Sequence, residues 1–327
     1  MEHQDLSFDA RLDLASLKNA VEEIKEALGQ IIIGQEEFID FLLVALLADG
    51  HVLIEGVPGV AKTITAKLLA KTVATDFSRI QFTPDLMPSD ILGTSVLNMK
   101  TSEFEFKEGP IFSNLILIDE INRAPAKTQA ALFEVMEERQ VTIDGNTYKM
   151  EAPFMILATQ NPIEQEGTYA LPEAQLDRFL MKITVGYPSL EEEVQILNAH
   201  HSRKGVAPET LVKPVLSVAD LTKFRKMIFE VVVEEKIIKY IAQIIGATRN
   251  HTHLFLGGSP RASLSVLMAS KAFAAIKGRD FVIPEDIKQV IKPVLRHRIM
   301  LTPEREMEGL TTDKVIDMIV HSVEVPR

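Results

Sequence analysis

The chain has 327 residues, of which 46% are hydrophobic and 25% charged, a balance that predicts a folded protein of roughly two domains. It contains no cysteine, which excludes disulfide bonds, thiolate catalysis and cysteine-based zinc sites. The formal net charge of -11 disfavours nucleic acid as a partner, because such a surface repels phosphates. The start lacks a signal-peptide profile, and the early apolar run at 41–48 is too short to span a bilayer, so we expect a cytoplasmic protein without membrane insertion.

Near the start, apolar residues recur with helical spacing in residues 14–28 and 35–49. The segment HVLIEG, at 51–56, is a short apolar run that ends in glycine, which predicts a buried strand. The stretch GVPGVAKT follows at 56–63, and residues 63–76 again show helical periodicity. GVPGVAKT therefore lies between a strand and a helix, the context that separates phosphate-binding loops from chance matches.

The alternation of strands and helices continues to residue 185. Near-continuous apolar strands predict a parallel sheet covered by helices on both faces. Two segments, 96–112 and 140–154, alternate with period two and predict β-hairpins inserted into this core; the second has Asp144-Gly145 or Gly145-Asn146 at its tip. The predicted strands are RIQF (79–82), LILIDE (115–120), FMILATQ (154–160) and MKITV (181–185), and AKTQAALFEVMEE (126–138) is predicted to be a helix.

After Pro188 the apolar pattern is helical only. We therefore predict an α/β core with N-terminal helices in residues 1–188 and a helical domain in residues 189–327. The helices predicted in the second domain are 190–200, 218–229, 234–249, 261–277 and 284–295.

GVPGVAKT departs at one position from the phosphate-loop pattern G-x-x-x-x-G-K-[ST], because Ala61 stands where glycine is expected. In such a loop the backbone N–H groups point at phosphate oxygens, the lysine, here Lys62, reaches the β- and γ-phosphates, and the Thr63 hydroxyl faces magnesium. The methyl group of Ala61 is tolerable if the backbone there stays open to L-amino acids, in which case Ala61→Gly should keep binding and slightly destabilise the loop. By itself the motif also fits a helix N-terminus that happens to hold glycine and lysine. The nucleotide-binding residues predicted here are Gly56, Val57, Pro58, Gly59, Val60, Ala61, Lys62, Thr63 and Ile64.

Two adjacent carboxylates, Asp119 and Glu120, end the predicted strand LILIDE. A parallel strand delivers its carboxyl end to the same sheet edge as the loop, where ligands bind. Asp119 would hold the magnesium shell and Glu120 would polarise the attacking water. Either carboxylate alone fits a strand that runs into an acidic turn, but the pair downstream of a phosphate loop is more specific.

Three further side chains follow at the ends of predicted elements. Asn161 either orients the lytic water and senses the γ-phosphate or is a simple turn residue before proline. Arg178, at the end of a short helical piece, is either a surface charge or an arginine finger donated to the neighbouring subunit's nucleotide. Arg261 begins a helix that Ser259 would cap, and is either a surface charge or a lid arginine that touches the γ-phosphate.

The order of the motifs GVPGVAKT, LILIDEINRAPAKTQAALFEVMEE, ATQNP, LDRF and GGSPRA resembles the AAA+ ATPases, and specifically the MoxR family. FTPDLMPSDILGT, EGPIF and DEINRAP look like MoxR signatures and are far more specific than the phosphate loop alone. The resemblance covers nearly the whole chain from IIGQ onward. Alanine before the lysine also resembles that family, so the departure at Ala61 is not evidence of decay.

This resemblance implies an AAA+ phosphate-loop sheet sandwiched by helices, with inserted β-hairpins and an all-α lid, that hydrolyses ATP with Mg²⁺. Arg123 would be a second candidate for acting across a subunit interface. The other roles that the resemblance implies are Gly34 and Gln35 near the adenine, Lys62 and Thr63 on phosphate and magnesium, Asp119 and Glu120 on magnesium and water, Asn161 as first sensor, Arg178 as finger, and Arg261 as second sensor.

The resemblance further implies a chaperone-like remodeller that assembles or metal-loads partner complexes, often ones with a von Willebrand A domain. We also expect a homo-oligomeric ring, a hexamer, because an arginine finger has a use only if a neighbouring subunit supplies the nucleotide. Two alternatives stay open. The first is a nucleic-acid motor or transcription regulator of the same superfamily, which the net charge disfavours, and the second is a nucleotide-gated binding switch with little turnover.

Overall fold

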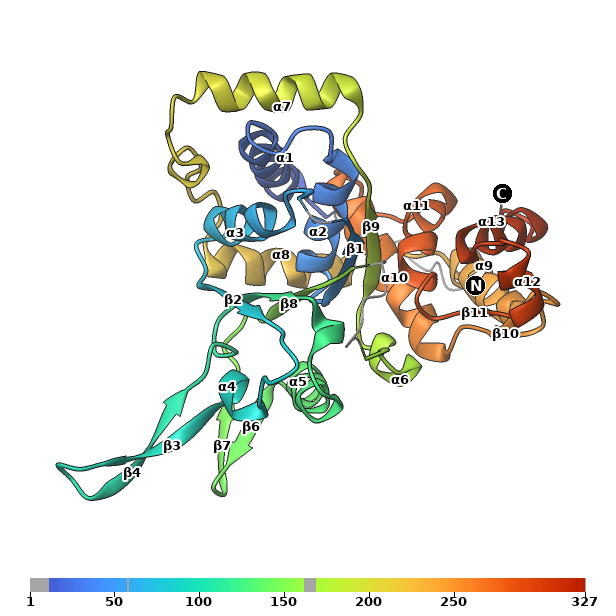
Figure 1. Ribbon diagram of the computed structural model, residues 1–327. Helices are drawn as coiled ribbons and strands as arrows, with labels where there is room; N and C mark the ends of the chain where they lie inside the picture. The colour runs from blue at the N-terminus through green and yellow to red at the C-terminus, as the bar shows by residue number, and fades with distance from the viewer. Residues whose placement is uncertain (1–11, 58, 162–168, 327) are drawn as a thin grey trace, which may run out of the picture.

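The computed structural model describes residues 12–57, 59–161 and 169–326 (Figure 1). Its centre is a five-stranded sheet with the strand order β2-β5-β8-β1-β9, in which every neighbouring pair is parallel. This confirms the predicted parallel sheet. The strands are β1 (Val52–Gly56), β2 (Phe77–Gln81), β5 (Leu115–Asp119), β8 (Met155–Gln160) and β9 (Met181–Val185).

The two faces of the sheet bury alternate residues of the same strands, as the period of two requires. On β5, Leu115 and Leu117 join one apolar cluster, and Ile116 and Ile118 join another. The first cluster includes α1 (Ala15–Gly29), α2 (Glu36–Leu47) and α3 (Lys62–Thr72). The second includes α4 (Pro88–Leu92) and α5 (Ala126–Glu138). Helices therefore cover both faces, as predicted.

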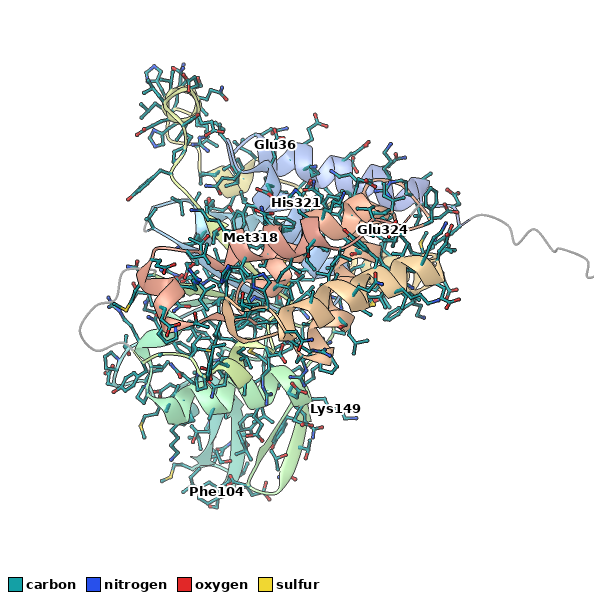
Figure 2. The ribbon with its side chains drawn as sticks, turned by 90° about the vertical axis from the view of Figure 1, so that its right-hand side faces the viewer. Glu36, Phe104, Lys149, Met318, His321 and Glu324 are labelled. Carbon is teal, nitrogen blue, oxygen red and sulfur yellow. The ribbon has the colours of Figure 1, made fainter. Side chains whose placement is uncertain are left out.

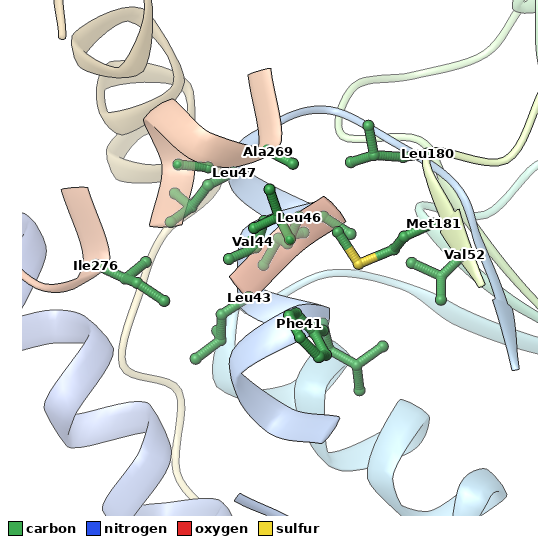
Figure 3. Close-up of a cluster of buried hydrophobic side chains, with 14 of the residues drawn as sticks. Phe41, Leu43, Val44, Leu46, Leu47, Val52, Leu180, Met181, Ala269 and Ile276 are labelled. Atoms are coloured by element: carbon green, nitrogen blue, oxygen red, sulfur yellow. The ribbon is translucent and has the colours of Figure 1, made fainter. Parts of the chain in front are cut away.

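Helix α2 is the apolar run that the sequence shows at 41–48, and nine of its residues are buried. Figure 3 shows Leu46 of this helix between Met181 of the sheet and Ala269 of α10 (Pro260–Ile276), and Leu43 on the side toward Ile276. This helix is thus enclosed by protein on several sides, which explains its nearly continuous hydrophobicity. Among the described residues, no helix combines the length and the apolarity needed to cross a bilayer.

The part of the chain after Pro188 is mainly helical. The bounds of its helices α7 to α11 agree with those of the predicted helices to within a few residues. Helix α7 begins after Ser189 and α8 after Ser217, and each serine caps its helix by accepting a backbone N–H. This part of the chain also contains a small antiparallel ribbon of β10 (Leu254–Leu256) and β11 (Met300–Leu301). Two further helices, α12 and α13, were not among the predicted ones. The remaining elements are α7 (Leu190–Ser202), η2 (Pro208–Thr210), α8 (Val218–Glu230), α9 (Glu235–Arg249), α11 (Pro284–Leu295), α12 (Pro303–Met307) and α13 (Thr312–Ser322).

Two antiparallel hairpins project from the body of the molecule (Figure 1). They are β3 (Gly93–Asn98) with β4 (Glu103–Glu108), and β6 (Gln140–Ile143) with β7 (Asn146–Lys149). Asp144 and Gly145 both have positive φ, 51° and 80°, the signature of a tight two-residue turn, so the tip is Asp144-Gly145. The rings of Phe106 and Tyr148 lie 4.3 Å apart and join the two hairpins.

Candidate functional site

The predicted phosphate loop connects β1 to α3 at the carboxyl edge of the sheet. Gly56 must be glycine, because a Cβ there would lie 2.6 Å from the carbonyl oxygen of Val185 on β9. Gly59 has φ 88°, a conformation that favours glycine. Helix α3 has no side-chain cap, so the N–H groups of its first turn suit an anion. Pro58 lies outside the described residues.

Ala61, the N-cap of α3, has φ 58° and ψ 14°, which is the left-handed region. The backbone at Ala61 is therefore not in a region open to all L-residues, as the sequence analysis required for a harmless alanine, and the stability change that we expect for Ala61→Gly reverses its sign. An L-residue in this conformation costs about 1–2 kcal/mol relative to glycine. That exceeds the roughly 0.4–1 kcal/mol that glycine costs through the entropy of the unfolded chain.

We expect Ala61→Gly to raise the free energy of unfolding by up to about 1 kcal/mol and to leave ATP affinity nearly unchanged. Thermal unfolding and ATP titration of the two proteins would measure both quantities. A glycine variant that unfolds at lower temperature, or that binds ATP much more weakly, would show that the methyl group makes favourable contacts that outweigh its strain.

Lys62 is the first residue of α3, and its Nζ donates a hydrogen bond of 2.6 Å to the carbonyl oxygen of Gly56. Burial lowers the pKa of this ammonium group, and the nearby carboxylates of Asp119 and Glu120 partly offset that effect. The loop and the acidic pair thus share one electrostatic environment, as expected for strands whose carboxyl ends meet at one sheet edge.

Asp119 ends β5 and is nearly buried. Its carboxylate accepts a hydrogen bond of 3.2 Å from the hydroxyl of Thr159 on β8 and forms an ion pair of 2.6 Å with Arg79 Nε on β2. The same hydroxyl accepts the backbone N–H of Glu120 at 3.0 Å. One threonine therefore fixes the relative position of both acidic residues.

Glu120 has φ 58°, a left-handed conformation that costs a non-glycine residue free energy and is concentrated at functional sites. It precedes the short helix η1 (Ile121–Arg123). Its carboxylate is held by Arg123 Nε at 2.9 Å and by Gln81 Nε2 at 3.3 Å. Arg123, considered from the sequence for a role across a subunit interface, thus contacts the acidic pair of its own chain.

Gln35 and Gly34 border the loop from the start of α2. Gln35 Nε2 donates to the carbonyl oxygen of Val60 at 3.2 Å, and its buried Oε1 has no hydrogen-bond partner within the part of the chain that is described. Gly34 has φ 74°, and a Cβ there would lie 2.3 Å from the Glu192 carboxyl carbon of α7. The free acceptor beside the loop suits an amino group such as that of adenine.

Four other predicted residues also lie at this edge. Thr63 and Ile64 belong to the first turn of α3, and Val57 follows β1 directly. Asn161 follows β8 directly, next to the strand that carries Asp119.

Arg178 and Arg261 lie close to each other but away from the loop. Arg178 Nη1 donates to the carbonyl oxygen of Phe133 at 2.6 Å and lies 3.3 Å from Glu137 Oε2. Arg261 Nη2 lies 2.9 Å from the other carboxylate oxygen of Glu137, near the end of α5. The two arginines are 83 residues apart in the sequence, and the fold brings both into contact with the carboxylate of Glu137.

This arginine pair is at the amino edge of the sheet, opposite the loop. Arg178 comes just before β9, whereas the loop follows the end of β1, the strand that pairs with β9. The five residues of β1 span roughly 17 Å at about 3.3 Å per residue. A cleft of about 330 Å³ beside the pair is lined by both arginines and by His51, which immediately precedes β1.

Three contact residues around the acidic pair were not among the predicted ones: Arg79, Gln81 and Thr159. Arg79 and Gln81 belong to the strand that the sequence does show as RIQF. Their role depends on β2 pairing with β5, with Gln81 opposite Asp119, and this pairing is not visible in a single sequence.

Comparisons with known proteins agree with this architecture. Residues 51–181 match the ATPase family associated with various cellular activities (AAA), and residues 246–319 match the AAA lid domain. The chain is 45% identical to Chaperone MoxR1 of Mycobacterium tuberculosis over 96% of this chain and 84% of that protein. It is 46% identical to the uncharacterized protein YeaC of Bacillus subtilis over 92% of this chain and 93% of that one. A crystal structure from Cytophaga hutchinsonii is 44% identical and has a TM-score of 0.89, covering 95% of this chain and 97% of that chain.

Proposed function

This chain belongs to the MoxR family of AAA+ ATPases, and we propose that it hydrolyses ATP with Mg²⁺ as a ring that remodels protein clients. The observation that carries the proposal is the common location of the α3 N-terminus, Lys62 and the two carboxylates at one sheet edge. That edge combines a cradle for phosphate with an acidic pair for metal and water.

The residues at this edge fit ATP. The backbone N–H groups of the loop and the ammonium group of Lys62 hold the phosphates. Gln35 Oε1, which is buried and has no hydrogen-bond partner among the described residues, would accept the adenine amino group, and the loop carbonyl at Val60 fixes that side chain.

The same edge fits Mg²⁺, which takes one or two protein oxygens and completes its shell with phosphate and water. Thr63 and Asp119 would supply those oxygens, because Thr159 and Arg79 use only part of the lone-pair capacity of the Asp119 carboxylate. A metal held by these two residues would neutralise charge on the β- and γ-phosphates.

Glu120 is the group that orients and deprotonates the attacking water, and Asn161 contacts the γ-phosphate and that water. Gln81 and Arg123 hold the Glu120 carboxylate in place. Its left-handed backbone keeps the side chain at the end of β5, beside Asp119, where the γ-phosphate would lie.

Arg178 and Arg261 serve the nucleotide of the neighbouring subunit. Both lie at the sheet edge opposite their own loop, about one strand length away, so neither is placed to reach its own γ-phosphate. In a head-to-tail ring the arginine edge of one subunit faces the loop edge of the next. Arg261 thus acts as a second sensor in the neighbour, beside the Arg178 finger.

We place this ring, a hexamer, in the cytoplasm, and its clients are proteins, for which a von Willebrand A domain is one candidate module. The net charge of -11 and the name of the MoxR1 chaperone relative support a protein client over DNA. A nucleic-acid motor and a switch with little turnover remain the competing functions, and DNA-stimulated hydrolysis and slow turnover respectively would favour them.

The client contact is the pair of joined hairpins. Phe104 and Met99 on the first hairpin are 74% and 84% exposed, and Figure 2 shows Phe104 at the far end of the molecule. Ser95 on β3 of this hairpin hydrogen-bonds Asp144 at the tip of the second, so the tip of the second hairpin is held against the basal half of the first. Exposed apolar side chains at a projecting tip suit unfolded or apolar segments of a client.

We expect that replacing Asp144 to Thr147 by a Gly-Ser linker, or Met99 and Phe104 by serine, leaves basal ATP hydrolysis unchanged and weakens client retention by a trapped Glu120→Gln ring. Quantitative comparison of the proteins retained by each ring measures this. Met307→Ser is the matched control, because Met307 is 90% exposed on α12, away from the hairpins. Equal retention by all rings, or salt-sensitive DNA binding that stimulates hydrolysis with no protein retained, would contradict the remodeller proposal.

A further inference from the structure

The segment that carries Arg178 is held by a buried arginine that follows α11. The side chain of Arg298 is 2% exposed. Its guanidinium donates to the carbonyl oxygens of Asp177 at 3.2 Å, Phe179 at 2.6 Å and Leu180 at 2.9 Å. One side chain therefore fixes the backbone on both sides of Arg178.

Asp177 extends this contact to the second arginine of the pair. Its carboxylate forms an ion pair of 2.7 Å with Arg298 Nε and accepts a hydrogen bond of 3.2 Å from the hydroxyl of Ser259. Ser259 is the N-cap of α10, and Arg261 is the second residue of that helix. The carboxylate next to Arg178 is thus bonded to the cap of the helix that presents Arg261.

His297 adds one more hydrogen bond to the same segment. Its Nε2 lies 3.1 Å from the carbonyl oxygen of Phe179, which can only accept, so Nε2 carries the proton. Burial lowers the pKa of this histidine well below its usual value, and the adjacent Arg298 charge lowers it further. The ring is therefore a neutral donor at physiological pH.

These bonds do more than stabilise the fold. A buried ion pair contributes little net stability compared with apolar residues of the same volume, because both charges lose their hydration. A guanidinium that bonds three carbonyl oxygens around one residue does, however, fix the direction of that residue's side chain. Arg178 itself is only partly buried and is held by Phe133 and Glu137.

We propose that Arg298 and Asp177 are positioning residues that set the geometry of Arg178 and Arg261 toward the nucleotide of the neighbouring subunit. This inference rests on the proposed role of the arginine pair across the interface. A misplacement of about 1 Å at a reacting centre can reduce turnover by about 10²-fold. The lid helices thus contribute to catalysis in the next subunit through the backbone at 177–180.

The test uses Arg298→Lys, which keeps the charge and loses the multiple bonds, and Asp177→Asn, which keeps the size and loses the charge. Both should lower kcat by about 10²-fold at unchanged Kd for ATP, because the loop edge is untouched. Arg296→Lys is the matched control: Arg296 lies at the same helix end and pairs with Asp313 at 2.9 Å, outside the arginine segment. It should keep wild-type turnover.

Mixed rings distinguish positioning from a general folding defect. Arg298→Lys should regain activity when mixed with Lys62→Ala, whose arginine edge is intact, and should gain none with Arg178→Ala. Wild-type turnover of Arg298→Lys, or no recovery with Lys62→Ala although mixed rings form, would overturn the inference. If Arg298→Lys does not assemble into rings, the same two mixtures, with Lys62→Ala and with Arg178→Ala, are made with Asp177→Asn, and their activities test the inference.

The reference mixture of Lys62→Ala with Arg178→Ala separates this inference from its premise. Suppose that the reference mixture recovers activity, but that neither Arg298→Lys nor Asp177→Asn shows the pattern of recovery with Lys62→Ala and none with Arg178→Ala. Then the inference alone is wrong. If the reference mixture itself fails in rings that are shown to be mixed, the role of the arginine pair across the interface is wrong, and the inference falls with it.

Discussion

Lys62→Ala is expected to abolish ATP binding, whereas Glu120→Gln is expected to bind ATP and hydrolyse it about 10²–10⁴-fold more slowly. The ammonium group of Lys62 lies at the α3 N-terminus beside the phosphate position, so its loss removes the main cation of the cradle. Glutamine keeps the shape of Glu120 and its bond to Gln81, but it cannot accept a proton from water.

Equilibrium ATP titration and steady-state phosphate release measure the two effects separately. Thr142→Ala serves as a surface control, because this threonine lies on the exposed β6–β7 hairpin. Equal hydrolysis by wild type and Glu120→Gln would remove Glu120 from its role as base. Undiminished ATP affinity in Lys62→Ala would mean that the nucleotide binds elsewhere.

Arg178→Ala is expected to lower turnover by about 10³–10⁵-fold while ATP affinity stays at the wild-type value. The reason is geometric: the guanidinium lies at the sheet edge opposite its own loop, so in the proposed ring it would stabilise transition-state charge in a neighbour. For the wild type, turnover per subunit should rise with protein concentration as rings form. Turnover that does not depend on concentration in the range where rings dissociate would argue that one chain forms a complete site.

The sequence predicts the site because its residues follow directly on regular elements. Strand β5 is a continuous apolar run that ends in Asp119, and β8 begins with the apolar run 155–158 and ends directly before Asn161. Parallel pairing brings such ends together whatever the order of the strands. The hairpins are likewise predictable, because their alternation and the Asp144-Gly145 turn are local features.

Other features depend on backbone conformation or on pairing between distant segments. The φ of 58° at Ala61 follows from the path of the loop, and nothing in the residue type alanine reveals it. The contacts of Arg298 cross 118 to 121 residues of sequence. Helix α13 is a different case. Its buried residues Val315, Ile316, Ile319 and Val320 recur at helical spacing, so the sequence pattern does indicate this helix.

We propose that two subunits build each active site, with the loop edge from one and the arginine edge from the next. This arrangement is tested by the ATP turnover of rings mixed from Lys62→Ala and Arg178→Ala subunits, each inactive alone. We predict that activity returns in the mixture, because some junctions join an intact cradle to an intact arginine edge. No recovery at any mixing ratio, in rings shown to contain both proteins, would contradict the account.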